Sequence, residues 1–190
     1  MATTPDRAPA GRIVLTYEDY CSLPDDGLRY EILDGELEMS PSPSVDHQRI
    51  AGALFAELRA HLQANQLGEA LVAPVDVLLA DTTIVVPDLV YVSRARAALI
   101  TRRAVEGAPD LLVEILSPSS TRRDRHTKAA LYARLGVAFY WIVDPDARTL
   151  EEYERGPAGD YRLVATHAGA GVARTACFPA LALELARVWP

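Results

Sequence analysis

The chain has 190 residues, of which 49% are hydrophobic and 24% are charged, and its formal net charge is −7. This length and composition predict one globular domain with a sizeable core and leave little room for a second domain. No apolar run approaches the roughly 20 residues that cross a bilayer, so a membrane-spanning protein is excluded and no membrane partner is expected. The acidic total also argues against a broadly basic nucleic-acid-binding protein.

The first residues are polar and rich in proline and alanine, without the apolar stretch of a secretory signal. We therefore expect residues 1–11 to be a disordered lead-in and residues 12–190 to form a single domain. Cys21 and Cys177 stand far apart and in no metal-binding pattern, which predicts two reduced thiols. A cytoplasmic location follows as the default expectation.

The N-terminal part of the chain predicts a helix followed by a hairpin. Thr16 is a typical N-cap, so a short helix is expected directly after it. Further on, alternating apolar residues flank Asp34 and Gly35. An Asp-Gly pair favours the positive φ angles of a type I′ turn, and residues 29–39 are therefore predicted to form a β-hairpin.

Ser44 is a second N-cap, and apolar residues at helical spacing predict a long helix to about residue 65, stopped by Gly68. The apolar run over residues 84–92 is interrupted by Pro87, which has no N–H to donate to a strand ladder. Further strands are predicted at residues 70–73, 75–79, 111–116, 137–143, 150–153 and 161–165, with a helix at 121–135 and a short apolar segment at 181–188.

The segment 111–143 has the pattern of a strand, a helix and a strand, which implies at least one parallel pair of strands. The predicted fold class is therefore α/β, with a mixed central β-sheet flanked by helices. No internal repeat or low-complexity tract interrupts this order of elements.

Two acidic residues stand where apolar ones are expected. Glu114 interrupts a buried strand and shares a face with Leu112 and Leu116, and Asp88 interrupts the run 84–92. A buried lone carboxylate is costly, whereas a divalent cation between two carboxylates converts their repulsion into binding. Two plainer interpretations stay open: Pro-Asp is a common turn element, and a strand carboxylate can be solvated at a sheet edge.

Basic residues gather in two stretches in spite of the acidic total. Segregated charge of this kind is compatible with a local surface for nucleic acid. The first cluster is Arg94, Arg96, Arg102 and Arg103, and the second is Arg122, Arg123, Arg125 and Lys128.

Several motifs stand in the order of one family. The residues that carry this order are Tyr30 to Glu36, His47, Pro87 to Val90, Val113 to Ser120, Asp124, Lys128, Tyr132, Gly136, Val137 and Tyr140 to Pro145. On these residues the chain resembles the Uma-type restriction endonuclease family of the PD-(D/E)XK nuclease superfamily, over roughly residues 14–187. The resemblance implies a restriction-endonuclease-like core with an N-terminal helix and β-hairpin.

The resemblance also implies roles for single residues. Asp88, Glu114 and the main-chain carbonyl of Ile115 are expected to hold the metal, with Glu31 as a further metal or water ligand. The superfamily pattern expects a lysine two residues after the second acid, but Leu116 stands there, and the resemblance transfers that role to Lys128.

Two more residues are expected around this site. Asp124 lies four residues before Lys128 and is expected to pair with it, and an ordinary surface pair is the alternative. His47 is expected to orient a phosphate or a water, and a polar residue at a helix start is the alternative. The aromatic residues Tyr132, Tyr140 and Trp141 stand within apolar patterns, so core packing is preferred to base stacking.

The expected function is a Mg²⁺- or Mn²⁺-dependent endonuclease that hydrolyses DNA phosphodiester bonds, with Asp88, Glu114, Lys128 and Glu31 as catalytic residues. DNA is the expected partner, and a homodimer would suit cleavage of both strands. Three alternatives stay open: an inactive nuclease-fold binding or scaffold domain, consistent with Leu116; a nuclease for RNA or branched DNA; and an interaction partner in a toxin or defence system.

Overall fold

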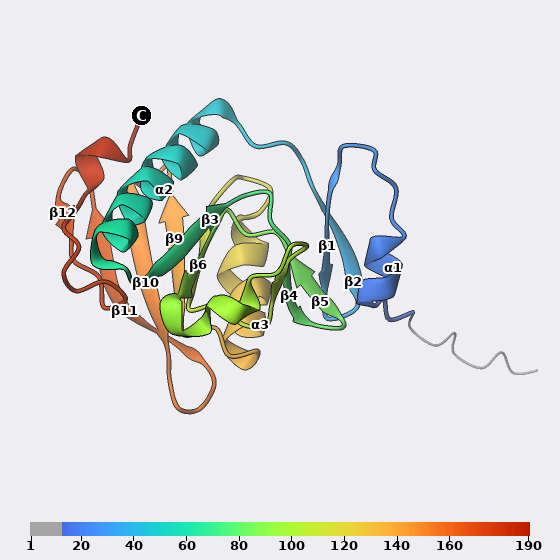
Figure 1. The fold of residues 1–190 in the computed structure, drawn as a ribbon. Coiled ribbons are helices and arrows are strands. Elements are labelled where there is room, and N and C mark those ends of the chain that lie inside the picture. The colour runs from blue at the N-terminus through green and yellow to red at the C-terminus, as the bar shows by residue number, and fades with distance from the viewer. Residues whose placement is uncertain (1–12) are drawn as a thin grey trace, which may run out of the picture.

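The computed structural model describes residues 13–190, so the expectation of a disordered lead-in at residues 1–11 lies outside the described residues. Figure 1 shows a central sheet with helices on both sides and a second sheet beside it. The central sheet has the strand order β11-β10-β9-β8-β6-β3. Its strands are β3 Gly68–Val72, β6 Leu89–Ser93, β8 Leu111–Ile115, β9 Phe139–Asp144, β10 Thr149–Arg155 and β11 Tyr161–Ala168.

The central sheet is mixed, as predicted. Strands β8 and β9 run parallel, and the other neighbouring pairs in this sheet are antiparallel. The chain between β8 and β9 is helical, with the π-helical segment η2 (Arg123–Lys128) followed by helix α3 (Ala129–Arg134). The predicted strand–helix–strand unit is therefore confirmed. The π turn within its helix was not expected from the sequence.

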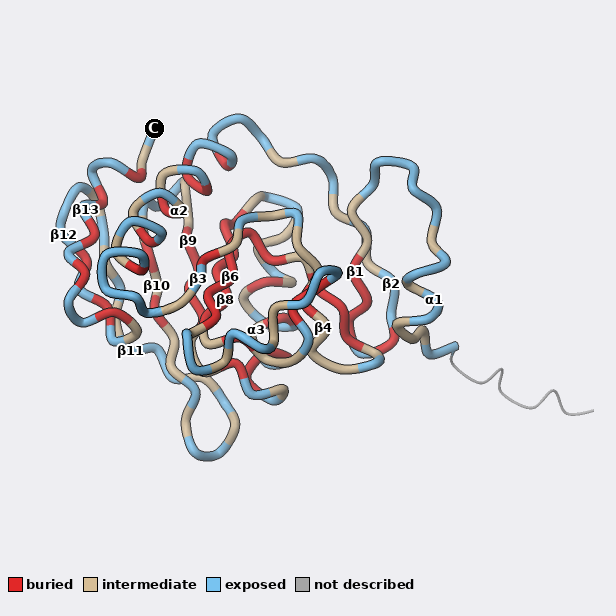
Figure 2. Tube along the Cα trace, in the orientation of Figure 1, coloured by how far each residue is buried: buried red, intermediate tan, exposed pale blue. Residues whose placement is uncertain are grey.

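The two faces of the central sheet are buried by different partners. Helix α2 (Val45–Asn65) and the C-terminal segment cover one face, where Leu54 and Trp141 belong to the same apolar cluster. Helix α3 and the second sheet cover the other face, where Leu112 and Tyr132 belong to a second cluster. Figure 2 shows the buried stretches concentrated in the strands between these layers. Because side chains alternate along β8, its residues pack in turn into the apolar clusters on the two faces of the sheet.

The second sheet has the strand order β2-β1-β5-β4-β7. Its strands are β1 Arg29–Leu33, β2 Glu36–Ser40, β4 Val77–Ala80, β5 Thr83–Val85 and β7 Val105–Glu106. The predicted hairpin is β1–β2, and its turn residues Asp34 and Gly35 have φ angles of 55° and 85°. A side chain at Gly35 would also meet Val14, so the turn requires glycine there. The sequence did not indicate that this hairpin lies in a second sheet.

The long helix α2 begins as predicted, because the Ser44 side chain accepts a hydrogen bond from the His47 N–H. The expectation that Gly68 stops this helix was wrong. Gln66 takes the left-handed conformation that ends it, with φ 52°. Gly68 instead opens β3, where a Cβ would clash with the carbonyl oxygen of Val92.

The remaining elements are short. Helix α1 (Tyr17–Cys21) begins at the predicted cap, Thr16, with a capping box. The others are the 3₁₀ segments η1 Arg94–Leu99 and η3 Leu185–Arg187 and a two-stranded sheet of β12 Val172–Ala173 and β13 Leu183–Glu184. Both cysteines are free, as predicted. Among residues 13–190, no helix has the length and apolar character needed to span a membrane.

Candidate active site

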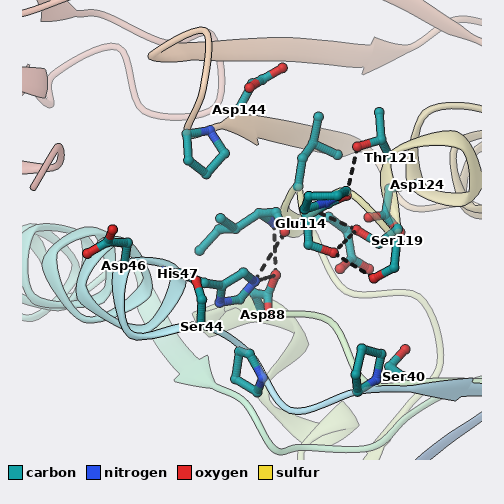
Figure 3. Close-up of a pocket in the computed structure, with 18 of the residues that line it drawn as sticks. Ser40, Ser44, Asp46, His47, Asp88, Glu114, Ser119, Thr121, Asp124 and Asp144 are labelled. Atoms are coloured by element: carbon teal, nitrogen blue, oxygen red, sulfur yellow. Dashed lines mark hydrogen bonds and ion pairs between the residues drawn. The ribbon is translucent and has the colours of Figure 1, made fainter.

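A cavity of about 1030 Å³ opens where the start of α2, the end of β8, η2 and the β9–β10 turn meet. Figure 3 shows side chains from these separate elements pointing into it, with Asp88 and Glu114 at its centre and His47 beside Asp88. The structure brings every residue that the sequence proposed for the site to this cavity. Its lining includes Glu31, His47, Asp88, Glu114, Ile115, Asp124 and Lys128.

The two central carboxylates are placed by neighbouring strands. Leu89 of β6 pairs with Val113 of β8, so Asp88, just before Leu89, lies at the end of β8 that carries Glu114. Asp88 lies in the break between β5 and β6, and its Oδ2 accepts a hydrogen bond of 2.8 Å from the Ile115 N–H. Asp88 and Glu114 are both buried, with 6% and 4% of their surface exposed. The plainer interpretation of Glu114 as a solvated residue at a sheet edge is therefore wrong.

Lys128 enters the same site from the helix that follows β8. Its Nζ lies 2.8 Å from Glu31 Oε1 and 2.9 Å from Glu114 Oε1. Asp124 Oδ1 is 3.9 Å from the same nitrogen, so the expected pair forms at the edge of ion-pair distance and is buried. Lys128 is itself only 3% exposed. Both Asp124 and Lys128 lie in the π-helical segment η2 and are buried, and π turns frequently occur at functional sites.

The buried charges at the site do not balance. Among the described residues, four buried carboxylates line the cavity together with the ammonium of Lys128, and they belong to Glu31, Asp88, Glu114 and Asp124. Burial, which is the largest cause, raises the pKa of Glu114 well above its usual value, and Lys128 opposes that shift. Burial also raises the pKa of Asp124. Burial disfavours the Lys128 ammonium, but the carboxylates outweigh it and raise its pKa.

His47 contacts two of the groups that the sequence proposed as metal ligands. Its Nε2 lies 3.1 Å from the Ile115 carbonyl oxygen and 3.1 Å from Asp88 Oδ2. His47 is buried, with 8% of its surface exposed. The ring therefore fixes the relative position of the carboxylate and the carbonyl, and the plainer interpretation of His47 as only a helix-start residue does not account for these contacts.

Tyr132 is a participant that the sequence did not reveal. It is fully buried, as its predicted core role requires, but its hydroxyl also donates a 2.7 Å hydrogen bond to Glu114 Oε1. The same carboxylate oxygen therefore accepts from both Tyr132 and Lys128. Two signals were available: Tyr132 stands among the residues that carry the family order, and it follows Lys128 by four residues and so lies on the same side of the helix.

The two basic clusters of the sequence do not form a basic wall around the cavity. None of the arginines of the first cluster, at positions between 94 and 103, lines it. In the second cluster, Arg123 lines it but pairs with Glu38, and Arg125 pairs with carboxylates outside the catalytic centre. The whole cavity lining contains seven acidic and five basic side chains. Its own charge therefore does not favour a polyanion without added cations.

The donors at the site suit a hard divalent cation. Among the described residues, no group of three or more histidine, cysteine, aspartate and glutamate side chains is arranged to hold a metal ion. An ion would therefore depend on Asp88, Glu114 and the Ile115 carbonyl, completed by water or substrate oxygens, which is the mixed ligand set that Mg²⁺ accepts. The uncompensated negative charge fits such an ion. Asp124 Oδ1, buried and without a hydrogen-bond partner in the described part of the chain, points to the same shortage of cations.

The fold and this cavity define an α/β protein with the architecture of restriction-endonuclease-like nucleases. The sequence model of the Uma2 family, described as "Putative restriction endonuclease", matches residues 17–186. The chain belongs to this family. None of the curated proteins matches it.

Six chains of solved structures match this one. A crystal structure of a "putative nuclease belonging to DUF820" from Anabaena variabilis has a TM-score of 0.75 and 18% identity, over 92% of this chain and 97% of that chain. This likeness shows a shared fold. The type IIG restriction endonuclease BpuSI matches with a TM-score of 0.39 and 18% identity, over 64% of this chain and 13% of that one, and at that score the match carries no argument.

Proposed function

We propose that this chain is a divalent-metal-dependent nuclease that hydrolyses phosphodiester bonds in DNA. One observation carries the proposal. Asp88 and Glu114 meet at the centre of a cavity, next to the Ile115 carbonyl, with the Lys128 ammonium against Glu114. Membership of a restriction endonuclease family supports hydrolysis of nucleic acid as the reaction.

In this mechanism Asp88, Glu114 and the Ile115 carbonyl would hold Mg²⁺ or Mn²⁺. Such an ion, when bound, would supply Lewis-acid stabilisation of the phosphate and would lower the pKa of a coordinated water. His47 keeps Asp88 in position relative to the carbonyl. The Lys128 ammonium stabilises negative charge that develops on the attacked phosphate. Glu31, which is hydrogen-bonded to Lys128, orients that ammonium and is also available to a water.

Leu116 favours the alternative, an inactive nuclease-fold domain that binds or scaffolds. Leu116 is buried and occupies the position at which the superfamily pattern has a lysine. The contacts of Lys128 argue against this alternative, because its ammonium lies 2.9 Å from Glu114 although it comes from a different element. Titration with Mn²⁺ distinguishes the two: a scaffold without a metal site shows no saturable heat of binding.

The test is incubation of plasmid DNA with Mn²⁺ and the wild type or the variants Asp88→Asn and Lys128→Met. We expect cleavage by the wild type and its loss in both variants, by at least about 100-fold, because each removes a charge that acts on the transition state. Asp81→Asn, in the exposed β4–β5 turn, is the control for loss of a carboxylate outside the cavity. Circular dichroism spectra check that each variant folds.

Equal nicking by all four proteins would assign the activity to a contaminant and reject the proposal. A parallel panel of single-stranded DNA, duplex DNA and RNA defines the substrate. Preferential cleavage of RNA would replace DNA in the proposal while keeping the chemistry.

A further inference from the structure

We propose that Arg29 forms a phosphate-binding subsite next to the catalytic centre, which takes the phosphate adjacent to the one that is cleaved. This inference rests on the proposed function, because it needs a nucleic-acid strand in the cavity. Arg29 is half-buried, lies in β1 and lines the cavity.

The position of Arg29 follows from the alternation of side chains along a strand. Arg29 and Glu31 are two residues apart on β1, so their side chains leave the same face of the strand. Two residues of a strand span about 7 Å. Glu31 holds Lys128 at the catalytic centre. Arg29 therefore lies close to Lys128 along the cavity wall, and Lys128 is the group that we assign to the cleaved phosphate.

Arg29 also differs from the other basic residues of the cavity in having no partner. Its side chain makes no hydrogen bond or ion pair with any residue in the described range 13–190. A half-buried guanidinium without a partner is suited to a phosphate, which it can contact through two N–H groups. The other basic residues of the lining are engaged as follows: Arg49 with Asp46, Arg123 with Glu38, Lys128 with Glu31 and Glu114, and Arg148 with the Pro190 oxygen.

A second cavity shares lining residues with the active-site cavity at Arg29. It has a volume of about 410 Å³, and Arg29 and Val86 line both this cavity and the active-site cavity. Its other lining residues include Tyr20, Tyr30, Asp25 and Asp76. An aromatic side chain such as Tyr20 offers a surface on which a base of an unpaired nucleic-acid strand can stack. A strand that leaves the catalytic centre in this direction passes Arg29.

The test measures the salt dependence of binding to a fluorescent single-stranded oligonucleotide by anisotropy, in an Asp88→Asn background that prevents cleavage. We expect Arg29→Ala to weaken binding about tenfold, as for a lost hydrogen bond to a charged group. The slope of log affinity against log salt should become shallower by about 0.7, the contribution of one phosphate contact on a single strand. Arg29→Lys should retain the slope because it retains the charge.

Arg102→Ala is the matched control, since Arg102 is exposed, lines neither cavity and carries the same charge. It should leave the slope unchanged. Equal slopes for Arg29→Ala and Arg102→Ala would overturn the subsite even if the wild type cleaves DNA. A wild type that neither binds nor cleaves nucleic acid would reject the subsite and the proposed function together. Arg29→Gln, which keeps most of the side-chain volume, replaces Arg29→Ala if that variant does not fold.

Discussion

Glu114 Oε1 accepts hydrogen bonds from two donors of different kinds, the Lys128 ammonium at 2.9 Å and the Tyr132 hydroxyl at 2.7 Å. Burying an ion pair costs several kcal/mol per charge, and the cost is offset only when the remaining hydrogen-bonding capacity is satisfied. Tyr132 supplies part of that capacity without adding charge. Its hydroxyl therefore fixes the direction in which the carboxylate points.

Tyr132→Phe removes this hydroxyl and leaves the ring. We expect a loss of about 1.5–3 kcal/mol in the free energy of unfolding, the usual range for a hydrogen bond to a charged group. We also expect a lower kcat with little change in KM, because the reorientation of Glu114 affects the transition state more than substrate binding. Urea unfolding and steady-state cleavage in Mn²⁺ measure the two effects.

Tyr140→Phe is the matched control. Tyr140 is equally buried, but its hydroxyl donates to the backbone carbonyl of Asp124. This variant should lose stability and keep kcat. If the two variants lowered kcat equally, the effect would come from general loosening of the core, and the positioning role of Tyr132 would be wrong.

His47 acts on the proposed metal ligands from the other side. His47→Ala should lower the affinity for Mn²⁺ or the cleavage rate by about 10- to 100-fold, the usual cost of losing a residue that orients metal ligands. Isothermal titration with Mn²⁺ gives the affinity without cleavage. His61→Ala is the control, because His61 lies near the other end of the same helix and contacts Asn65. Unchanged Mn²⁺ affinity and cleavage in His47→Ala would show that its contacts are only structural.

At the scale of elements, the π-helical segment η2 carries both Asp124 and Lys128, which line the cavity. A π turn contains one residue more than an α-helical turn, so removing one residue can restore a regular helix. His126 is exposed and lies between the two buried residues. Its deletion leaves Asp124 and Lys128 three residues apart in place of four, which changes their relative position in the site although both spacings lie on one side of a helix.

The His126 deletion is expected to fold, because α3 can keep its register against the sheet. It should lose cleavage activity, because Asp124 then shifts by one residue relative to Lys128 and Glu114. Far-ultraviolet circular dichroism and urea unfolding test whether the deletion variant folds. The plasmid assay measures its cleavage activity. His126→Ala keeps the turn and should stay active. A deletion variant with wild-type activity would show that the π turn is not needed to place Asp124 relative to Lys128.

Local signals explain which elements could be predicted from the sequence. Asp34 and Gly35 predict the hairpin because the turn type depends on those two residues. Glu114 was found because a charge in a buried strand conflicts with the apolar pattern around it. The separate second sheet, the π turn and the unpartnered Arg29 depend on contacts distant in sequence, which no local pattern encodes. Lys128 was placed only by family resemblance, because its spacing from Glu114 is not a strand periodicity.

At the scale of the whole molecule, a cluster of tyrosines fills the layer between the central sheet and α3. Tyr140 contacts the rings of Tyr132, Tyr153 and Tyr161. Burial, the largest cause in each case, raises the pKa of Tyr153 to about 12 and the pKa values of Tyr132 and Tyr140 well above the usual value. Nearby carboxylates add to these shifts, since a second negative charge is unfavourable in the same layer.

These shifts predict alkaline instability. An unfolded tyrosine loses its proton near pH 10, whereas the folded tyrosines keep theirs. The contribution of these tyrosines to the free energy of unfolding is therefore fully present below about pH 10. It falls as the pH rises above that value, by up to about 1.4 kcal/mol per pH unit for each fully buried tyrosine. Urea unfolding from about pH 8 to about pH 11 measures the decline. Tyr140→Phe removes one titrating group, so its free energy of unfolding should decline less steeply with pH than that of the wild type. Equal slopes for the two proteins would contradict the assignment of Tyr140 as a group that stays protonated in the folded state.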